Sequence, residues 1–584
     1  MLLHRRSRFD WPASTDRVVV RAVVRSALLA VLVATLAGRA GADFFDDVGY
    51  TQLEDELAQL GLPLPTGAGI SVSQIEAPGD GNYAPDITVS ELSGKTFVFK
   101  SGASGSSSHA TGVARSFYGK TQSMAPDVGG AGSSIHLWDA NAWVGSGFLN
   151  TGLVSEPKIE KQRVQNHSWI GTDGSPEESL RRLDYAAARD GFLAVLGMNN
   201  GSSNLLPDLL GQSYNGISVG RSDGKHSHGL TTIDGVGRIK PEIVAPTSTT
   251  SQATARISSA TAMLLDQALS IDQKAGTDSA SQALSVKAAL LAGATKDEFG
   301  SEWDRSAPGG SYIPLDYQYG AGQLNVYRSY QILAAGEQNP GAAAEVSPTG
   351  WDYGQTSGGS QFYFFEVPGG YRLSEFSALL TWNRDIIDVD QGPGFSPSPA
   401  LEDLDLKLRS AANFVPAAVL DESASAVDNL EHVYFNEPLG IGQDLAPGQY
   451  ALEVTAGSAN VRFGLAWLSS FALVVGDMNL DGFLDFDDIG VFVVALNDPA
   501  TYEATFGVPA SQNGDVTGDG LNDFDDIDAF VALFTPDSTA GPARVAPEPP
   551  AHVLAGLLGI AVTVYGRRRR LRATANAPGT GTGV

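Results

Sequence analysis

The chain has 584 residues, no cysteine and a formal net charge of −28 at pH 7. This length exceeds what one hydrophobic core can organise, so we expect several domains. The absence of cysteine excludes disulfide bonds and zinc–thiolate sites, and the strong negative charge disfavours nucleic acid as a partner.

Residues 1–42 have the pattern of a signal peptide for export. Arginine-rich residues precede the apolar stretch SALLAVLVATLAG, which is followed by Ala40-Gly41-Ala42. This order of charged, apolar and small residues predicts cleavage before Asp43. We therefore expect an exported protein that is displayed at the cell envelope or surface or is secreted. A later translation start stays open because the arginine-rich stretch is long.

The segment GAGISVSQIEAPG (residues 67–79) predicts a buried strand that ends at Glu76. A carboxylate in this place could orient a histidine and stabilise its imidazolium form. Asp80 and Asp86 are alternatives for the same role, but they follow Pro78 in a predicted loop. A solvated carboxylate at the strand end is the structural alternative.

The segment SSHATGVARSFYG (residues 107–119) contains His109, our candidate catalytic histidine. The remaining histidines fit this role less well, because they lie in the signal region, in a strand-like run or beyond residue 335: His4, His167, His432 and His552. His226 and His228 have the spacing of metal ligands. No third ligand is evident for them, so we interpret KHSHG as a polar loop.

Two further segments supply an amide and a hydroxyl. LGMNNG (residues 196–201) contains Asn199, with Asn200 as the alternative if the loop register shifts by one. In residues 237–265, an extended run ends at Pro246 and a helical pattern then begins close to Ser251. The N-terminus of a helix stabilises developing negative charge. A Ser/Thr N-cap before a core helix would be the commoner explanation of such a hydroxyl.

In chain order, the acid, histidine, asparagine and serine segments resemble the motifs of subtilisin-like (subtilase) peptidases. SHATGVA is similar to the family's H-G-T-x-V-A, MNNG to G-N-x-G, and TSQA to T-S-x-A after G-R-x-K-P. Further similar segments are NHSWIG (residues 166–171) and YGAGQLNVYRSY (residues 319–330). The resemblance implies an α/β subtilisin-like domain with a parallel sheet at residues 43–335.

The resemblance also implies a serine endopeptidase that acts on protein or peptide substrates. Ser251 would attack the peptide carbonyl, while His109, oriented by Glu76, would take and return the proton. The Asn199 side chain and the Ser251 backbone N–H would bind the oxyanion. The chain departs from the family motifs at five positions: Glu76, Ala110, Thr249, Ala255 and Ser259. These departures leave a second hypothesis, a catalytically inactive subtilase-fold protein for surface display or adhesion.

Residues 338–470 change to short alternating strands separated by Gly, Pro and Asn, among them FYFFEV, FSALLTW, YALEV and VRFGLAW. This pattern predicts a β-sandwich. The order of the strands resembles the pre-peptidase C-terminal and proprotein-convertase-like sandwich domains. Asp403, Asp405 and Glu431 could bind Ca²⁺, but acids at turns and strand edges are the preferred interpretation.

Residues 474–536 contain two similar loops with oxygen-bearing side chains at fixed spacing. Calcium loops place such ligands at positions 1, 3, 5, 9 and 12, with a backbone carbonyl at position 7. The first loop offers Asp477, Asn479, Asp481, Phe483, Asp485 and Asp488, and the second offers Asp515, Thr517, Asp519, Leu521, Asp523 and Asp526. Both loops precede a helical apolar pattern. The pair resembles type I dockerins, which implies a small α-helical module that binds Ca²⁺ and either a cohesin-like partner or a structural, tethering role.

The C-terminal residues have the pattern of a sorting signal. A linker (537–546) precedes Pro547-Glu548-Pro549, an apolar stretch and the arginines that end at residue 570. Residues 547–570 resemble the PEP-CTERM signal, which implies transient membrane insertion and processing by an exosortase-type enzyme. Under the positive-inside rule, residues 571–584 would form a cytoplasmic tail. A plain single-span anchor is the alternative.

Overall fold

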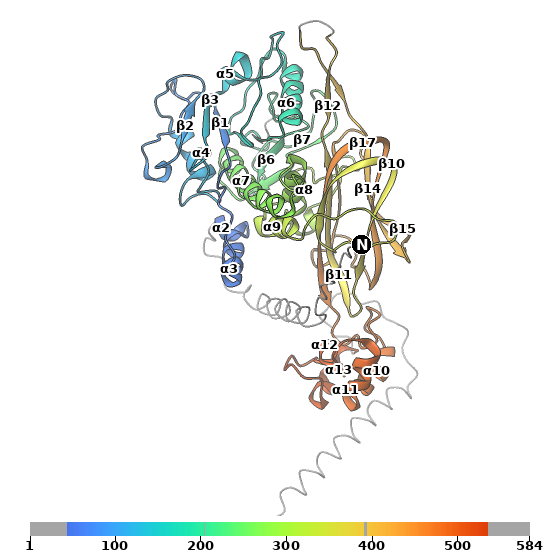
Figure 1. The fold of residues 1–584 in the computed structure, drawn as a ribbon. Coiled ribbons are helices and arrows are strands. Elements are labelled where there is room, and N and C mark those ends of the chain that lie inside the picture. Colours follow the sequence, from blue (N-terminus) through green and yellow to red (C-terminus); the bar gives the residue numbers. More distant parts are fainter. Residues whose placement is uncertain (1–43, 204, 391–393, 535–584) are drawn as a thin grey trace, which may run out of the picture.

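The computed structural model describes residues 44–203, 205–390 and 394–534 (Figure 1). The predicted signal peptide, linker, sorting signal and cytoplasmic tail lie outside the described residues. Within the part that the structure describes, no helix is long and apolar enough to cross a membrane. Three units follow one another along the chain: an α/β domain, an antiparallel β-rich domain and a small helical unit (Figure 1).

The α/β domain is built on a seven-stranded parallel sheet, as predicted for this part of the chain. The strand order is β2-β3-β1-β4-β5-β6-β9. Strands β1 and β5 are buried along their whole length, as expected when both faces of a sheet are covered. The strands are β1 (Val72–Glu76), β2 (Phe97–Phe99), β3 (Ile135–Asp139), β4 (Val164–His167), β5 (Leu193–Gly197), β6 (Ile217–Arg221) and β9 (Ile243–Ala245).

Helices cover the two faces of this sheet. Val72 of β1 packs in the main core with α4 (Ser108–Tyr118) and α7 (Thr250–Ala275), whereas Ile75 packs on the other face with α6 (Pro176–Asp190). The other helices of the domain are α2 (Phe44–Asp47), α3 (Tyr50–Leu60), α5 (Ala140–Ala142), α8 (Ala283–Ala292) and α9 (Val326–Ala334). Its shorter elements are β7 (Gly229–Leu230), β8 (Ile239–Lys240) and the helical turns Ser90–Leu92, Trp143–Gly147 and Gly300–Glu302.

The β-rich domain is antiparallel and centres on the long strand β17 (Gly448–Leu473). β10 (Gly350–Val367) pairs with almost the whole of β17 on one side. On the other side, β14 (Leu404–Ala412) pairs with the first part of β17, and β11 (Tyr371–Trp382) pairs with the last part. Apolar side chains of β10, β11, β14 and β17 form one buried core. The remaining elements are β12 (Asp385–Asp388), β13 (Pro397–Ala400), β15 (Val415–Ser423), β16 (Leu430–Asn436) and the turn Glu437–Leu439.

The β-rich domain packs directly against the α/β domain through α8, which lies beside β11 and β17 (Figure 1). Trp351, Leu379 and Ala466 of the β-rich domain are buried in the same apolar core as α7 and α8. At Gly464 of β17, a Cβ atom would lie 2.3 Å from the carbonyl oxygen of Leu284. Only glycine therefore allows β17 to approach α8 so closely.

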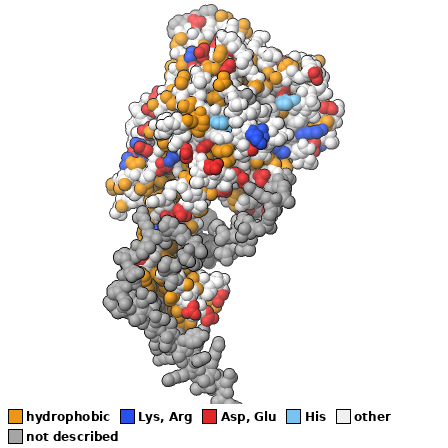
Figure 2. All heavy atoms as spheres, turned by 180° about the vertical axis from the view of Figure 1, so that it is seen from behind, with side chains coloured by type: hydrophobic (Ala, Val, Ile, Leu, Met, Phe, Trp, Pro, Cys, Tyr) orange, Lys and Arg blue, Asp and Glu red, His pale blue; other side chains and the backbone are white. Residues whose placement is uncertain are grey.

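The small helical unit contains α10 (Asp487–Asn497), α11 (Pro499–Phe506), α12 (Ser511–Gly514), the turn Phe524–Asp526 and α13 (Ile527–Leu533). A helix follows each of the two similar loops, as the apolar pattern predicts. Phe492 and Phe530, which occupy equivalent places in the two repeats, stack with ring centres 3.8 Å apart in the core. On the face shown in Figure 2, acidic side chains gather at one side of this unit, next to apolar ones.

Candidate active site

Glu76 and His109 are in direct contact. Glu76 ends β1 and is 1% exposed, whereas the His109 side chain, on the first turn of α4, is 49% exposed. His109 Nδ1 lies 2.8 Å from Glu76 Oε2. An ionised carboxylate can only accept, so this contact places the histidine proton on Nδ1 and leaves Nε2 as an acceptor. Nε2 has no hydrogen bond to any described residue.

The two groups shift each other's pKa. The hydrogen bond to Glu76 raises the pKa of His109, and burial of the ring opposes this effect. Burial raises the pKa of Glu76, and the hydrogen bond and charge of His109 oppose it. The arrangement therefore stabilises an imidazolium that forms next to a buried carboxylate.

Gln74 fixes the second oxygen of Glu76. Its Nε2 donates to Glu76 Oε1 at 2.9 Å and to the Ala110 carbonyl at 2.9 Å, and its own Oε1 accepts from the Tyr118 hydroxyl. Sequence reasoning missed Gln74, although it lies two residues before Glu76 and therefore on the same face of the strand. These contacts hold a glutamate, whose side chain is one methylene longer than that of an aspartate, in reach of His109.

The alternative acids do not contact His109. Asp80 is exposed in a left-handed backbone conformation with φ of 51°. Asp86 accepts hydrogen bonds from the backbone and hydroxyl of Thr88 at 3.0 and 2.6 Å. Of the three acids considered from sequence, the structure brings Glu76 to the histidine.

Ser251 is the second residue of α7, and it does not cap this helix. The N-cap is Thr249, whose hydroxyl accepts from the Gln252 N–H at 3.2 Å. The Ser251 hydroxyl instead donates to the Ser168 carbonyl at 3.3 Å, and the Ser168 hydroxyl donates to the Ser251 carbonyl at 2.9 Å. Among the described residues, no hydrogen bond joins Ser251 to His109, although α4 and α7 pack side by side.

Ser259, a second departure from the subtilase motif, has a structural role as well. Its hydroxyl accepts from the Met124 N–H at 2.9 Å and so ties α7 to the segment after α4. Together with the Thr249 cap, this contact shows that hydroxyl groups at both positions stabilise the helix that carries Ser251.

The two candidate asparagines point to different partners. Asn199 Nδ2 donates to the Leu205 carbonyl at 2.9 Å, in the loop that follows. Asn200 Oδ1 accepts from the Thr250 N–H at 3.0 Å, which places its carboxamide at the first turn of α7, next to Ser251. The geometry therefore favours the alternative residue, Asn200, as the candidate side-chain donor to an oxyanion.

A pocket of about 190 Å³ opens beside Ser251. Its walls come from the chain after β4, the end of β5 and the start of α7: Ser168, Trp169, Ile170, Gly197, Met198, Asn199, Asn200, Thr250 and Ser251. None of these side chains is charged. Such a pocket can hold an uncharged side chain next to the hydroxyl of Ser251.

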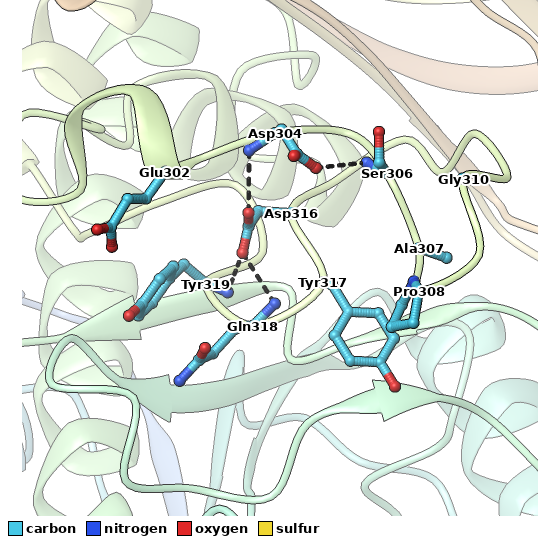
Figure 3. Close-up of a pocket in the computed structure, with 10 residues that line it drawn as sticks. All are labelled: Glu302, Asp304, Ser306, Ala307, Pro308, Gly310, Asp316, Tyr317, Gln318 and Tyr319. Carbon is cyan, nitrogen blue, oxygen red and sulfur yellow. Dashed lines mark hydrogen bonds between the residues drawn. The ribbon is translucent and has the colours of Figure 1, made fainter.

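The loop 302–319 lines another pocket, of about 470 Å³ (Figure 3). Asp316 shapes this loop, because its carboxylate accepts hydrogen bonds from the backbone N–H groups of Asp304, Gln318 and Tyr319 at 3.0, 2.8 and 2.7 Å (Figure 3). Asp316 is thus engaged with the backbone of its own loop and holds Gln318 in place.

His226 connects that loop to the asparagine turn. Its Nε2 donates to the Gln318 carbonyl at 2.8 Å, its Nδ1 accepts from the Arg221 N–H at 3.0 Å, and it forms a β-bridge with Asn200. Both ring nitrogens are used, and burial lowers the pKa of His226 to about 4. His226 is buried within the fold, where it supports Asn200.

The predicted calcium loops have matching backbone contacts. Asp477 accepts from the Gly482 N–H at 2.8 Å, and Asp515 accepts from the Gly520 N–H at 2.7 Å. The last acid of each loop, Asp488 or Asp526, accepts from three backbone N–H groups of its own loop. Among the described residues, no group of three or more His, Asp or Glu side chains converges closely enough to hold a metal ion.

No protein-family model matches the sequence, and no curated protein matches it. Among solved structures, the chain is similar to a lanthipeptide protease (TM-score 0.33, 13% identity, covering 50% of this chain and 97% of that chain). It is also similar to the MycP3 protease from the type VII (ESX-3) secretion system (0.28, 15%, 50% and 89%). A further neighbour is the pre-peptidase C-terminal domain of a collagenase from Bacillus anthracis (0.15, 13%, 23% and 100%). The first two neighbours are proteases.

Proposed function

We propose that the protein is a subtilisin-like serine endopeptidase with glutamate in the acid position. The observation that supports this most is the buried Glu76 carboxylate holding His109 by Nδ1, on a helix packed against the helix that carries Ser251. A half-exposed histidine with an available Nε2 is the form that a general base requires.

In this proposal, Ser251 attacks the substrate carbonyl while His109 Nε2 takes the hydroxyl proton, and the protonated ring then delivers it to the leaving amine. Attack requires the Ser251 hydroxyl to leave the Ser168 carbonyl and turn toward the ring. Water then hydrolyses the acyl-enzyme with His109 again as the base.

The oxyanion would lie at the start of α7. The Ser251 backbone N–H is in the first turn, where N–H groups have no partner within the helix. The Asn200 carboxamide, held by the Thr250 N–H, is our proposed second donor, and the helix dipole adds to the stabilisation. The uncharged pocket beside Ser251 would accept an uncharged substrate side chain.

Labelling with a fluorophosphonate tests the proposed function. We expect one covalent adduct on the full exported chain, located at Ser251 by peptide mapping and absent from Ser251→Ala. Ser248→Ala, which changes an exposed hydroxyl close by, should still be labelled. If an authentic subtilase is labelled and this protein is not, the peptidase proposal is wrong.

The second candidate is the catalytically inactive subtilase-fold protein for display or adhesion. The contact between the Ser251 hydroxyl and the Ser168 carbonyl, instead of the imidazole, favours it. The two candidates give opposite results in the labelling experiment.

We also propose that the helical unit is a dockerin-like module that binds Ca²⁺ through both loops. The donor set fits a hard cation, and the acids of the first loop lie in each other's field: burial raises the pKa of Asp477 to about 6, and the charges of Asp488 and Asp481 add to this. The metal would draw carboxylates together that do not converge in the structure. We further propose that the protein is exported and that an exosortase-type enzyme processes residues 547–570. The helical unit would bind a cohesin-like partner.

A further inference from the structure

A pocket of about 660 Å³ lies on the face of the parallel sheet that packs against α6. It is lined by β3 residues, by the chain just after β2 and by residues 158–162, which precede β4. It shares no residue with the pocket beside Ser251. Because Glu76 and His109 face the side of α4 and α7, this pocket is separate from the proposed catalytic groups.

Lysine side chains gather around this pocket. The whole sequence contains eleven lysines against 66 acidic residues, and three of the lysines line the pocket: Lys100, Lys158 and Lys161. Among the described residues, none of the three forms an ion pair with a carboxylate. Lys158 donates to the Ser146 carbonyl at 2.7 Å, and the Lys100 ammonium lies 5.4 Å from the centre of the Trp138 ring.

The one acid in the lining does not neutralise these lysines. Glu160 is buried, and its carboxylate accepts from the Ser73 hydroxyl at 3.1 Å, from Gln165 Nε2 at 3.0 Å and from two backbone N–H groups. These four donors use its oxygens to fix the segment before β4. The pocket therefore keeps an excess of positive charge.

His136 adds a neutral donor. Its Nε2 accepts from Gln162 Nε2 at 2.9 Å, so the ring proton is on Nδ1. Burial, and then the charge of Lys100, lowers the pKa of His136 to about 4, so the ring is neutral at physiological pH.

Apolar groups form the rest of the lining. Trp138 and Phe148 are buried in the α6-side core, and Ile159 is 73% exposed. Cationic groups and apolar surface thus occur together in a pocket within the usual range for small-molecule sites, about 300–1,000 Å³.

We propose that this pocket binds a small organic anion, with a carboxylate or phosphate group held by Lys100 and Lys161 and an apolar body against Trp138 and Ile159. A bare inorganic anion would use only the charged part of the pocket, and a neutral apolar molecule only the rest. Nucleic acid is disfavoured because the chain as a whole carries a large negative charge.

Isothermal titration of the full exported chain tests this proposal with four probes: 2-naphthoate, 1-naphthyl phosphate, neutral 2-naphthol and inorganic phosphate. We expect both naphthyl anions to bind, and naphthol and inorganic phosphate to bind at least about tenfold more weakly. The ratio between the two anions identifies the preferred head group. Binding of neither anion at millimolar concentration, or equal binding of naphthol, would overturn the proposal.

Variants locate the site. Lys100→Met and Lys161→Met should each weaken anion binding about tenfold while preserving the melting temperature, and Lys100→Arg should retain most of it. Lys274→Met, which removes an exposed lysine at the end of α7, is the matched control and should bind normally. Unchanged affinity in the Lys100→Met/Lys161→Met double variant would show that the anion binds elsewhere.

Discussion

At the scale of single residues, the candidate site depends on Glu76, the glutamate that holds His109 by a hydrogen bond. The longer side chain still reaches His109 because Gln74 fixes its other oxygen and the strand end is fully buried. The charge of this group, more than its length, should decide catalysis, because it stabilises the imidazolium that forms in the transition state.

Glu76→Gln should lower kcat by about 10⁴-fold, the effect typical of neutralising a triad acid, without changing the fold. The measurement is kcat with a peptide substrate, together with circular dichroism. Asp86→Asn is the matched control, since Asp86 contacts Thr88 and not His109. If Glu76→Gln loses no more kcat than Asp86→Asn does, Glu76 is not the residue that orients His109.

The pH profile should report the Glu76–His109 contact. A general base works only when neutral, and the hydrogen bond to Glu76 raises the pKa of His109 above its ordinary value of 6.5. Activity should therefore fall as the pH drops through a pKa above 6.5. In Glu76→Gln this acid limb of kcat/KM should move to lower pH; a limb that stays in place contradicts the contact.

Asn199 and Asn200 are the two candidates for the side-chain oxyanion donor, and their alanine variants distinguish them. Asn200→Ala should reduce kcat about 100- to 1,000-fold, as expected for loss of one oxyanion donor, with little change in KM. Asn199→Ala, which removes a contact to Leu205 only, should cost much less. The reverse order of effects would restore Asn199, the residue predicted from sequence.

At the scale of elements, the packing of α4 against α7 determines the geometry of the candidate site, and the packing of α8 against β17 joins the domains. α4 and α7 carry His109 and Ser251 at equivalent places, the second residue of each helix. Thr249 supplies the N-cap of α7, which leaves the Ser251 hydroxyl outside the capping network.

Gly464→Ala should destabilise the protein by about 1–3 kcal/mol, because the added methyl group would meet the Leu284 carbonyl and push β17 away from α8. Urea unfolding and limited proteolysis measure the effect. Gly457→Ala, in the same strand with open space around it, should be neutral. Equal stability of the two variants would show that the interface relaxes easily.

At the scale of the whole molecule, the α/β and β-rich domains are joined by buried charge as well as by a shared core. Arg384 of the β-rich domain donates to Asp184 and Asp234 of the α/β domain at 2.5 and 2.7 Å. Arg328 and Glu375 form a further, largely buried pair across the interface. We therefore expect these two domains to move as one body. The helical unit lies below them (Figure 1) and is tied to the β-rich domain by Arg372, which donates to the Gly482 carbonyl at 2.6 Å.

Calcium should stabilise the helical unit. We expect the full chain to bind two Ca²⁺ ions with different affinities, because Thr517 offers a hydroxyl, a poorer calcium ligand than the carboxamide oxygen that Asn479 offers in the first loop. Asp481→Ala should remove the tighter event in calorimetry. Asp528→Asn, an exposed acid of α13 outside both loops, is the control. Identical melting in chelator and in Ca²⁺ would contradict the proposed module.

The sequence by itself determined the order of the elements, the strand that ends at Glu76, the helix that begins beside Ser251 and the repeated acidic loops. These features depend on periodicity, caps and spacing, which act over a few residues. Only the tertiary structure decided that Glu76 meets His109, that Asn200 rather than Asn199 faces α7, and that Lys100 lines one pocket together with Lys158 and Lys161. Those contacts depend on strand order and on how helices pack across the sheet, and neither is encoded locally.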